Sequence, residues 1–161
     1  MDNKEIVKRL IDSNLFLTLA TSNNNIPWIC PLFFASDNQF NLYFTSYNDS
    51  QHVKNIQGNP KVAVSIYNTL AAPGKGNTQG VQISGTCHRI TGDNLKDAIE
   101  VVYNKRFPDP KERETRDLSV EHFSLPDSYG RTDHIYKIET DKFFILDKKA
   151  GKDTRIEIQV K

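Results

Sequence analysis

Residues 40–68 read FNLYFTSYNDSQHVKNIQGNPKVAVSIYN, and this stretch decides how the chain is interpreted. It opens with a run of strand-forming residues that ends at Ser46. It closes with an alternating run over 61–68, typical of a strand that buries one face. Between them a short helical pattern begins at Ser50, a favourable N-cap, and stops before Pro60. The stretch therefore predicts a strand, a short helix and a second strand.

Outward from this stretch, β-rich or alternating runs predict further strands over 15–21, 28–36, 81–91, 134–140, 142–147 and 155–160. Apolar stripes at helical spacing predict helices over 3–13 and 93–106. Pro31 cannot donate to a β-ladder, so its strand should have a bulge or an open edge there. The Gly/Pro-rich segment 69–80 is predicted to be a loop, and the charged segment 109–117 to be solvated.

Seven or eight short strands joined mostly by tight turns, with three helices, predict a mainly β protein. A largely antiparallel sheet that closes into a small barrel with peripheral α-helices leaves few exposed edges, so this is the favoured architecture. A two-sheet sandwich is the alternative, and the strand pattern alone does not separate the two. The length of 161 residues predicts a single domain over 1–161.

Composition narrows the functional class. The chain has 21 basic and 20 acidic residues, a formal net charge of +1, and thus no electrostatic reason to bind nucleic acid or an anionic membrane. The longest nearly apolar run, residues 26–35, is too short to span a bilayer. Cys30 and Cys87 stand outside any CxxC or metal-binding spacing, which favours a reducing, cytoplasmic location. The four histidines are scattered, so no metal site is predicted.

The start of the short helix combines Ser50, His52 and Lys54. A helix N-terminus exposes free N–H groups and a partial positive charge, and phosphate is a common occupant of such a position. A hydroxyl, an imidazole and an ammonium group would add hydrogen bonds and charge to the same anion. The alternative is that Ser50 only caps the helix and that the other two side chains are solvated.

The order of several segments resembles a known family. These segments are an N-terminal helix, the strand LAT (19–21), a strand ending in the apolar pair Phe33 and Phe34, the strand LYFTS (42–46), and GVQISG (80–85). Over most of the chain they resemble the FMN-binding split-barrel superfamily that includes pyridoxamine 5'-phosphate oxidase. Residues 98–108 and 135–149 are similar to a smaller, uncharacterised bacterial branch of it. The resemblance implies a split antiparallel β-barrel, FMN as cofactor, and a homodimer with both flavins at the subunit interface.

The resemblance also implies site residues. Thr45 and Ser46 would line the FMN phosphate and ribityl region, and Ser50 and His52 would meet the phosphate with Lys54 nearby. The isoalloxazine would run along four residues of one strand, Ile29, Cys30, Pro31 and Leu32. A neighbouring strand would approach the ring with Gly80, Val81 and Gln82. A second subunit could add Arg106 or Lys148 in trans.

The sequence departs from the oxidase pattern at several positions. Ile29, Phe34 and Gln51 stand where the oxidase proper has basic residues, so the phosphate site has less positive charge. The Arg-rich, His-containing substrate motif of the oxidase has no counterpart in residues 147–161. We therefore expect no pyridoxamine 5'-phosphate oxidase activity.

The resulting prediction is an FMN-dependent oxidoreductase that passes electrons or hydride between a reduced nicotinamide or a similar small-molecule donor and an unidentified acceptor. The flavin would carry the chemistry, so no catalytic side chain is assigned. Two alternatives stay open: a non-catalytic barrel that carries flavin or haem, and a cofactor-free interaction domain. The large apolar side chains of residues 28–35 predict a homodimer that buries more than roughly 2,000 Å².

Overall fold

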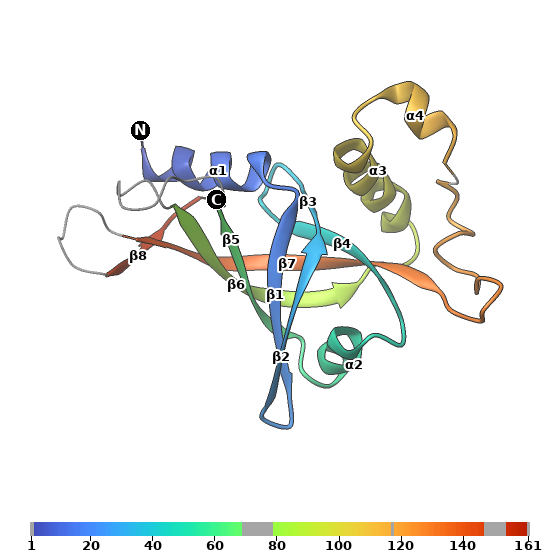
Figure 1. The fold of residues 1–161 in the computed structure, drawn as a ribbon, viewed down its shortest axis with the longest axis horizontal. Coiled ribbons are helices and arrows are strands. Elements are labelled where there is room, and N and C mark those ends of the chain that lie inside the picture. The colour runs from blue at the N-terminus through green and yellow to red at the C-terminus, as the bar shows by residue number, and fades with distance from the viewer. Residues whose placement is uncertain (1, 69–78, 117, 147–153, 161) are drawn as a thin grey trace.

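The computed structural model describes residues 2–68, 79–116, 118–146 and 154–160 (Figure 1). Helix α1 covers Asn3–Ser13, as predicted, and leads into the paired strands β1 (Phe16–Asn23) and β2 (Ile26–Phe33). The other elements are β3 (Ala35–Ser36), β4 (Leu42–Tyr47), α2 (Gln51–Gly58), β5 (Lys61–Tyr67), β6 (Gly80–Arg89), α3 (Asn94–Arg106), α4 (Pro110–Glu114), β7 (Asp133–Leu146) and β8 (Arg155–Ile158). Most of the predicted loop 69–80, and Lys148, lie outside the described residues.

The described strands form one antiparallel sheet in the order β2-β1-β5-β6-β7-β4-β3, and β8 pairs with β7. Only Phe34 separates β2 from β3, so one bent segment pairs with β1 before Phe34 and with β4 after it. This segment closes the ring of strands seen in Figure 1. The predicted mainly antiparallel β-barrel with peripheral helices is thus confirmed, and the two-sheet sandwich is wrong. Strand β2 ends the order of pairing, so Pro31 lies on the open edge that its missing N–H predicts.

Strand β7 corrects one prediction, because residues 134–140 and 142–147 were expected to be separate strands. A single strand of 14 residues runs through both. Ser84 pairs with Lys142 and Gly85 with Thr140, which leaves Asp141 as the extra residue of a β-bulge. The strands approach closely there, because a Cβ on Gly85 would lie 2.6 Å from the Glu139 carbonyl oxygen.

Two apolar clusters pack on opposite faces of the sheet. The larger fills the barrel with buried side chains from α1, α2 and the strands β1, β4, β5, β6 and β7, among them Val7, Leu10, Leu19, Phe44, Val53, Ile56, Val64, Ile83 and Ile138. The smaller lies under α3 and includes Tyr43, Leu95, Ala98, Ile99, Val102 and Ile135. Although α2 has only eight residues, it buries Val53 and Ile56. The start of α2 is therefore held in place by the core.

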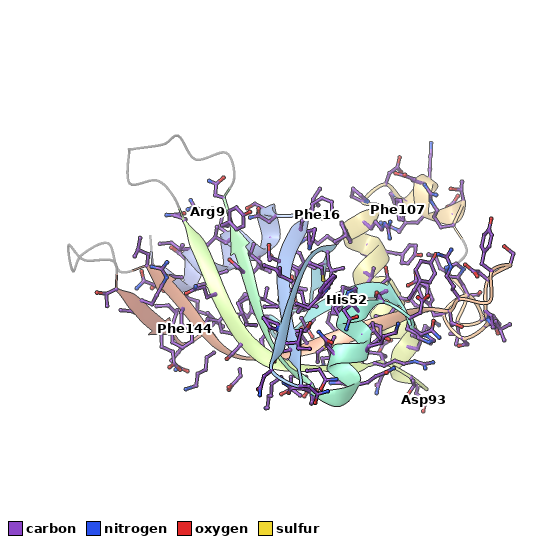
Figure 2. The ribbon with its side chains drawn as sticks, turned by 60° about the horizontal axis from the view of Figure 1, so that its bottom comes forward. Arg9, Phe16, His52, Asp93, Phe107 and Phe144 are labelled. Carbon is purple, nitrogen blue, oxygen red and sulfur yellow. The ribbon has the colours of Figure 1, made fainter. Side chains whose placement is uncertain are left out.

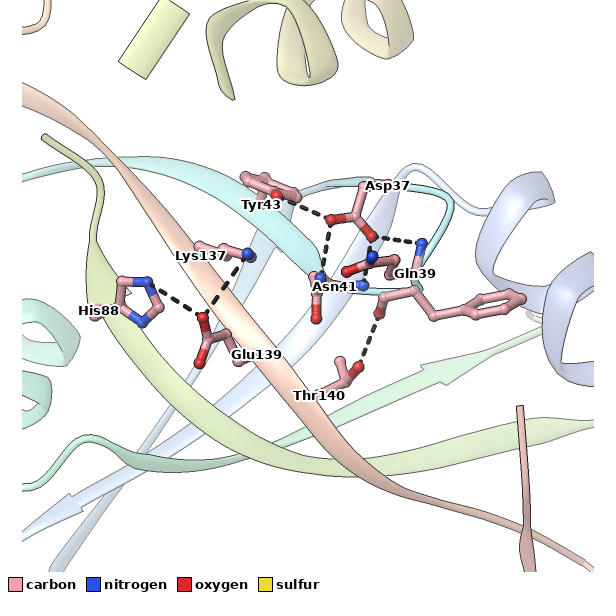
Figure 3. Close-up of polar contacts among 9 residues, drawn as sticks. Asp37, Gln39, Asn41, Tyr43, His88, Lys137, Glu139 and Thr140 are labelled. Atoms are coloured by element: carbon pink, nitrogen blue, oxygen red, sulfur yellow. Dashed lines mark hydrogen bonds and ion pairs between the residues drawn. The ribbon is translucent and has the colours of Figure 1, made fainter. Parts of the chain in front are cut away.

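The turn between β3 and β4 is organised by Asp37 (Figure 3). Its carboxylate accepts hydrogen bonds of 2.9 Å from the backbone N–H groups of Gln39 and Asn41, from the Asn41 amide and from the Tyr43 hydroxyl. Burial acts to raise the pKa of Asp37, but these hydrogen bonds outweigh it, and the pKa is lowered. Asp37 is fully engaged in shaping the chain, so its role is structural.

The charged segment 109–117 contains a short helix, α4, that the sequence pattern did not predict. Asp109 accepts a hydrogen bond from the Lys111 backbone N–H at 2.9 Å, and Pro110 follows it at the first helical position. No described residue of α4 is buried, which agrees with a solvated segment. Among the described residues, no helix has both the length and the apolar character needed to cross a membrane.

Candidate functional site

The candidate site lies where β4 ends and α2 begins. The chain turns after Tyr47, whose carbonyl accepts a hydrogen bond from the Ser50 backbone N–H at 3.2 Å. Ser50 is the N-cap of α2 with an extended backbone, but its side chain makes no cap hydrogen bond. Its hydroxyl donates to the Tyr47 carbonyl at 2.9 Å instead. The first-turn N–H groups of α2 are thus left without the usual side-chain acceptor.

Three side chains meet at this point. The Ser46 hydroxyl lies 2.7 Å from His52 Nε2 and 3.0 Å from the Ser50 hydroxyl, and Ser50 lies 3.3 Å from the same imidazole nitrogen. Ser46 belongs to β4, whereas Ser50 and His52 belong to the start of α2. Figure 2 shows His52 at the start of α2, within the body of the molecule. We call Ser46, Ser50 and His52 the hydroxyl–imidazole cluster.

The hydrogen bonds of the cluster determine which atom donates in each contact. The Ser50 proton is committed to the Tyr47 carbonyl, so the Ser50 oxygen can only accept from Ser46. If Ser46 donates to Ser50, Ser46 can only accept from His52, which must then carry its proton on Nε2. All contacts are satisfied in one direction, from His52 through Ser46 and Ser50 to the Tyr47 carbonyl. The network thereby assigns the Nε2–H tautomer to His52.

His52 is held in this position by packing. Its side chain is 8% exposed, and its ring meets the Phe44 ring edge-on, with 6.1 Å between the centroids. Burial lowers the pKa of His52, so the imidazole is neutral near pH 7. Two hydrogen bonds fix α2 against β1, since Asn55 donates to the Thr21 hydroxyl at 3.1 Å and Asn59 to the Ser22 carbonyl at 3.1 Å. The cluster therefore presents preorganised neutral donors.

Two other predicted phosphate residues are not brought into the cluster. Lys54 is exposed, and within the described residues no contact of its ammonium group is seen. Thr45 lies between Phe44 and Ser46 on β4, so its side chain points to the opposite face, toward α3. Only Ser46, Ser50 and His52 of the five meet through their side chains.

The four predicted ring residues of β2 are divided between the two faces of the sheet. Cys30 and Leu32 pack against the barrel core, whereas Pro31 is exposed and Ile29 is 66% exposed on the outside. Burial raises the pKa of the Cys30 thiol, which makes it a poor nucleophile. The residues of β6 divide in the same way, because Val81 is buried and Gln82 faces outward.

The outward-facing residues form an apolar hollow of about 310 Å³ on the outer face of the sheet. Strand pairing sets Thr18, Ser65 and Gln82 in one row, and Ala20, Ala63 and Ser84 in the next. Ile29 and Phe144 also line it, and Figure 2 shows Phe144 on β7, away from His52. The sequence analysis missed most of these residues. Their signal was the small residues, such as Ala63 and Ser65, between the buried positions of β5.

The remaining predicted site residues are less informative. Gly80 pairs with Tyr67 at the start of β6, where a Cβ would lie 3.2 Å from the Tyr67 Cβ. The Arg106 guanidinium lies 5.5 Å from the centre of the Phe33 ring of the same chain. Its predicted role across a dimer remains a prediction. In the described part of the chain, no group of three or more His, Cys, Asp or Glu side chains is arranged to hold a metal ion.

The chain is similar to several known proteins. Residues 4–124 match the pyridoxamine 5'-phosphate oxidase protein family. A NimC/NimA family protein from Clostridium acetobutylicum has 17% sequence identity and a TM-score of 0.60, covering 96% of this chain and 91% of its own. A FAD-binding protein from Mesorhizobium loti has 16% identity and a TM-score of 0.63, with coverages of 89% and 90%. No curated protein sequence matches the chain.

A haem-binding protein from Mycobacterium smegmatis also has this fold. It has 14% identity and a TM-score of 0.69, and the match covers 99% of this chain but only 59% of that protein. At such low identities the similarity shows the shared architecture alone.

Proposed function

Because the chain belongs to the pyridoxamine 5'-phosphate oxidase family, as its match over residues 4–124 shows, we propose that it is an FMN-binding oxidoreductase. The observation that carries this proposal is the hydroxyl–imidazole cluster at the N-terminus of α2. It combines two hydroxyl groups and an imidazole N–H with the free N–H groups of a helix start. These groups are donors suited to a phosphate, and the helix dipole favours its charge.

Ser50 is the residue that would turn toward the phosphate. Its proton is donated to the Tyr47 carbonyl, and only rotation of the hydroxyl is needed to redirect it. Ser46 and His52 keep the Ser50 oxygen supplied with a donor, so its own proton stays available. The site lacks a fixed cation, since Lys54 is exposed at the helix surface. We therefore assign the phosphate contacts to Ser50 and the first turn of α2, and we assign to His52 the positioning of Ser46 and Ser50.

The flat ring of the cofactor fits the apolar hollow on the outer face. Small side chains such as Ala20 and Ala63 leave a shallow surface there, and Gln82 offers a polar group at its margin. The hollow and the hydroxyl–imidazole cluster lie on opposite faces of the strands, since Ser46 shares its face with the core residue Phe44. One FMN cannot use both places in the same subunit. We therefore propose a homodimer in which the cluster of one subunit holds the phosphate and the hollow of the other subunit holds the ring.

Bound FMN would supply the redox chemistry, and the protein would supply binding, orientation and exclusion of water. We propose that electrons or hydride pass between a reduced nicotinamide or similar small-molecule donor and an acceptor that is not pyridoxamine 5'-phosphate. Two free cysteines, of which Cys87 is buried, favour the cytoplasm. Burial raises the pKa of Cys87 to about 12, so this thiol is not a redox participant.

The test is a titration of FMN and riboflavin against wild type and variants. Ser50→Ala removes the hydroxyl that would turn toward the phosphate, and it should weaken FMN binding about 10- to 100-fold, the effect of ~1.5–3 kcal/mol for one hydrogen bond to a charged group. His52→Leu replaces the imidazole with an apolar side chain of similar size and removes the donor to Ser46, so it should weaken FMN binding somewhat less. His52→Gln, which restores an N–H donor, should recover part of the loss.

Lys54→Ala is the matched control on the same helix, and it should change FMN affinity little. Riboflavin lacks the phosphate and should bind all four variants as it binds wild type. Equal FMN affinity across wild type, His52→Leu and Ser50→Ala, with folding intact by circular dichroism, would show that the cluster only holds the start of α2 against β4.

A second candidate is a non-catalytic barrel that carries flavin or haem. The haem-binding protein of the same fold favours keeping it. Absorption spectra after addition of FMN or haemin would identify the cofactor, and steady-state oxidation of NADH would separate an enzyme from a carrier. A protein whose spectrum is unchanged by both cofactors would be a cofactor-free interaction domain.

A further inference from the structure

Besides the apolar hollow, a pocket with polar side chains lies between α2 and the ends of β6 and β7, and the proposed function does not use it. Its volume is about 510 Å³. Its lining includes Asn48, Gln57, Cys87, Arg89, His134 and Tyr136. No lining residue is acidic, and the polar lining is composed mostly of groups that donate hydrogen bonds. The composition points to an anionic ligand.

Strand pairing brings the key side chains to one face. Arg89 of β6 pairs with Tyr136 of β7, which in turn pairs with Phe44 of β4. Directly opposed residues of an antiparallel pair point to the same side, and the Tyr136 and Phe44 rings are indeed stacked with 5.3 Å between centroids. His134 lies two residues before Tyr136 on the same face. Arg89, Tyr136 and His134 therefore converge on the pocket.

His88 also lines the pocket, but its side chain points to the opposite face of the sheet from that of Arg89. It alternates with Arg89 along β6, and its Nε2 lies 3.9 Å from Glu139, which also lies 3.8 Å from Lys137 (Figure 3). Glu139 and Lys137 thus form an ion pair on the opposite face of the sheet. The Arg89 guanidinium, in contrast, makes no ion pair or hydrogen bond with any residue that the structure describes.

The charge of Arg89 acts on two buried groups. Burial lowers the pKa of His134, a hydrogen bond to the Phe123 carbonyl opposes this, and the positive charge of Arg89 lowers it further. Burial raises the pKa of Tyr136 to about 12, although Arg89 acts in the opposite direction, while Cys87 and Asp133 add to the increase. Arg89 thus faces both side chains across the pocket, where a bound anion would compensate its charge.

The hydrogen bond of His134 to the Phe123 carbonyl fixes the tautomer of its ring. Its Nδ1 lies 3.1 Å from the Phe123 carbonyl oxygen, which can only accept, so Nδ1 carries a proton. The side chain is 6% exposed and therefore fixed in orientation. Because the pKa of His134 is lowered, the ring is neutral near pH 7 and Nε2 is an acceptor, so His134 lines the pocket without donating to an anion.

We propose that this pocket binds a small oxyanion, either a carboxylate or a phosphate group, through Arg89 with Tyr136 as a further donor. The site is distinct from the hydroxyl–imidazole cluster, although His134 pairs with Ser46 and the two places adjoin. Arginine suits planar or tetrahedral oxyanions because its N–H groups can contact two oxygens at once. The proposal does not require that the chain bind FMN.

The experiment uses the full chain without flavin. Inorganic phosphate and benzoate are titrated separately, with binding followed by imidazole resonances of 15N-histidine-labelled protein. Arg89→Gln should weaken binding by about tenfold or more, the effect of losing one charge-assisted hydrogen bond. Arg116→Gln removes the same charge from an exposed arginine of segment 109–117 and should leave binding unchanged. Tyr136→Phe keeps the ring stacked on Phe44 and should weaken binding by a smaller factor.

The stronger of the two probes identifies the ligand as a phosphate or a carboxylate, and equal binding of both supports an oxyanion site without preference. Failure of the wild type to bind either probe at millimolar concentration would overturn the proposal. Equal losses in Arg89→Gln and Arg116→Gln would overturn it as well. FMN affinity should be unchanged in Arg89→Gln, and a loss of FMN binding as large as that of phosphate would show that the pocket is part of the flavin site.

Discussion

The inner and outer faces of β1, β5 and β6 differ in the size and burial of their side chains. On the inner face, Leu19, Val64 and Ile83 are buried in the barrel core. The outer face of the same strands carries small side chains, such as Ala20 and Ser65, and an apolar hollow. Neighbouring residues on one strand thus serve opposite purposes, since one face stabilises the subunit and the other offers a surface for binding.

The inner face also admits polar side chains, but only where they are hydrogen-bonded. His52 and Asn55 are both less than 10% exposed, and each has a partner on a neighbouring strand, Ser46 and Thr21. Buried polar groups without partners would cost several kcal/mol. A functional cluster on this face is therefore rigid, whereas a surface on the outer face remains adaptable.

The largest expected difference between the faces is in subunit stability. Leu19→Ala removes a fully buried side chain and should lower the free energy of unfolding by about 2–5 kcal/mol at every protein concentration. Ile29→Ala, on the outer face, should lower the free energy of unfolding only at protein concentrations at which the subunits associate, because this side chain is buried only in the dimer. Urea unfolding at several protein concentrations measures both, and a concentration-independent loss of similar size in the two variants would contradict the division into faces.

A second expected difference is in self-association. Ile29→Asp places a charge in the outer hollow and should weaken dimerisation by at least about a hundredfold, since burying an unpaired charge costs several kcal/mol. Ile26→Asp is the control, because Ile26 is 69% exposed on the same strand but lies at the hairpin end. Light scattering measures the result. A wild-type monomer at micromolar concentration would remove the outer face from the proposed interface.

The smallest expected effect is the pH dependence of stability. Burial lowers the pKa of His52 in the folded state below its ordinary value of 6.5. As the pH falls, the unfolded chain therefore binds this proton more readily than the folded chain does. Stability should therefore fall as the pH drops from 7 toward 5, and His52→Gln should reduce this slope. Urea midpoints between pH 5 and 8 would test this, and an unchanged slope in His52→Gln would show that another group controls it.

Local patterns were sufficient to predict most of the elements. Alternation in 61–68 and helical spacing in 3–13 and 93–106 correspond to β5, α1 and α3. The proximity of Ser50 and His52 was also predictable, because both lie within the first turn of one short helix. Their meeting with Ser46 follows from the short connection between β4 and α2. These features depend on neighbours in the sequence, whose geometry local propensity determines.

Long-range register decided the rest. Runs such as 29–32 and 80–82 appeared to be continuous binding surfaces, but strand alternation sends their side chains to two faces, and only the packing shows which is which. The union of β7 into one strand depends on a bulge opposite Gly85. Arg89 and His134 lie 45 positions apart in the sequence and meet only because β6 pairs with β7. Such contacts arise from pairing between distant segments, which no local pattern encodes, so the tertiary structure alone could bring them together.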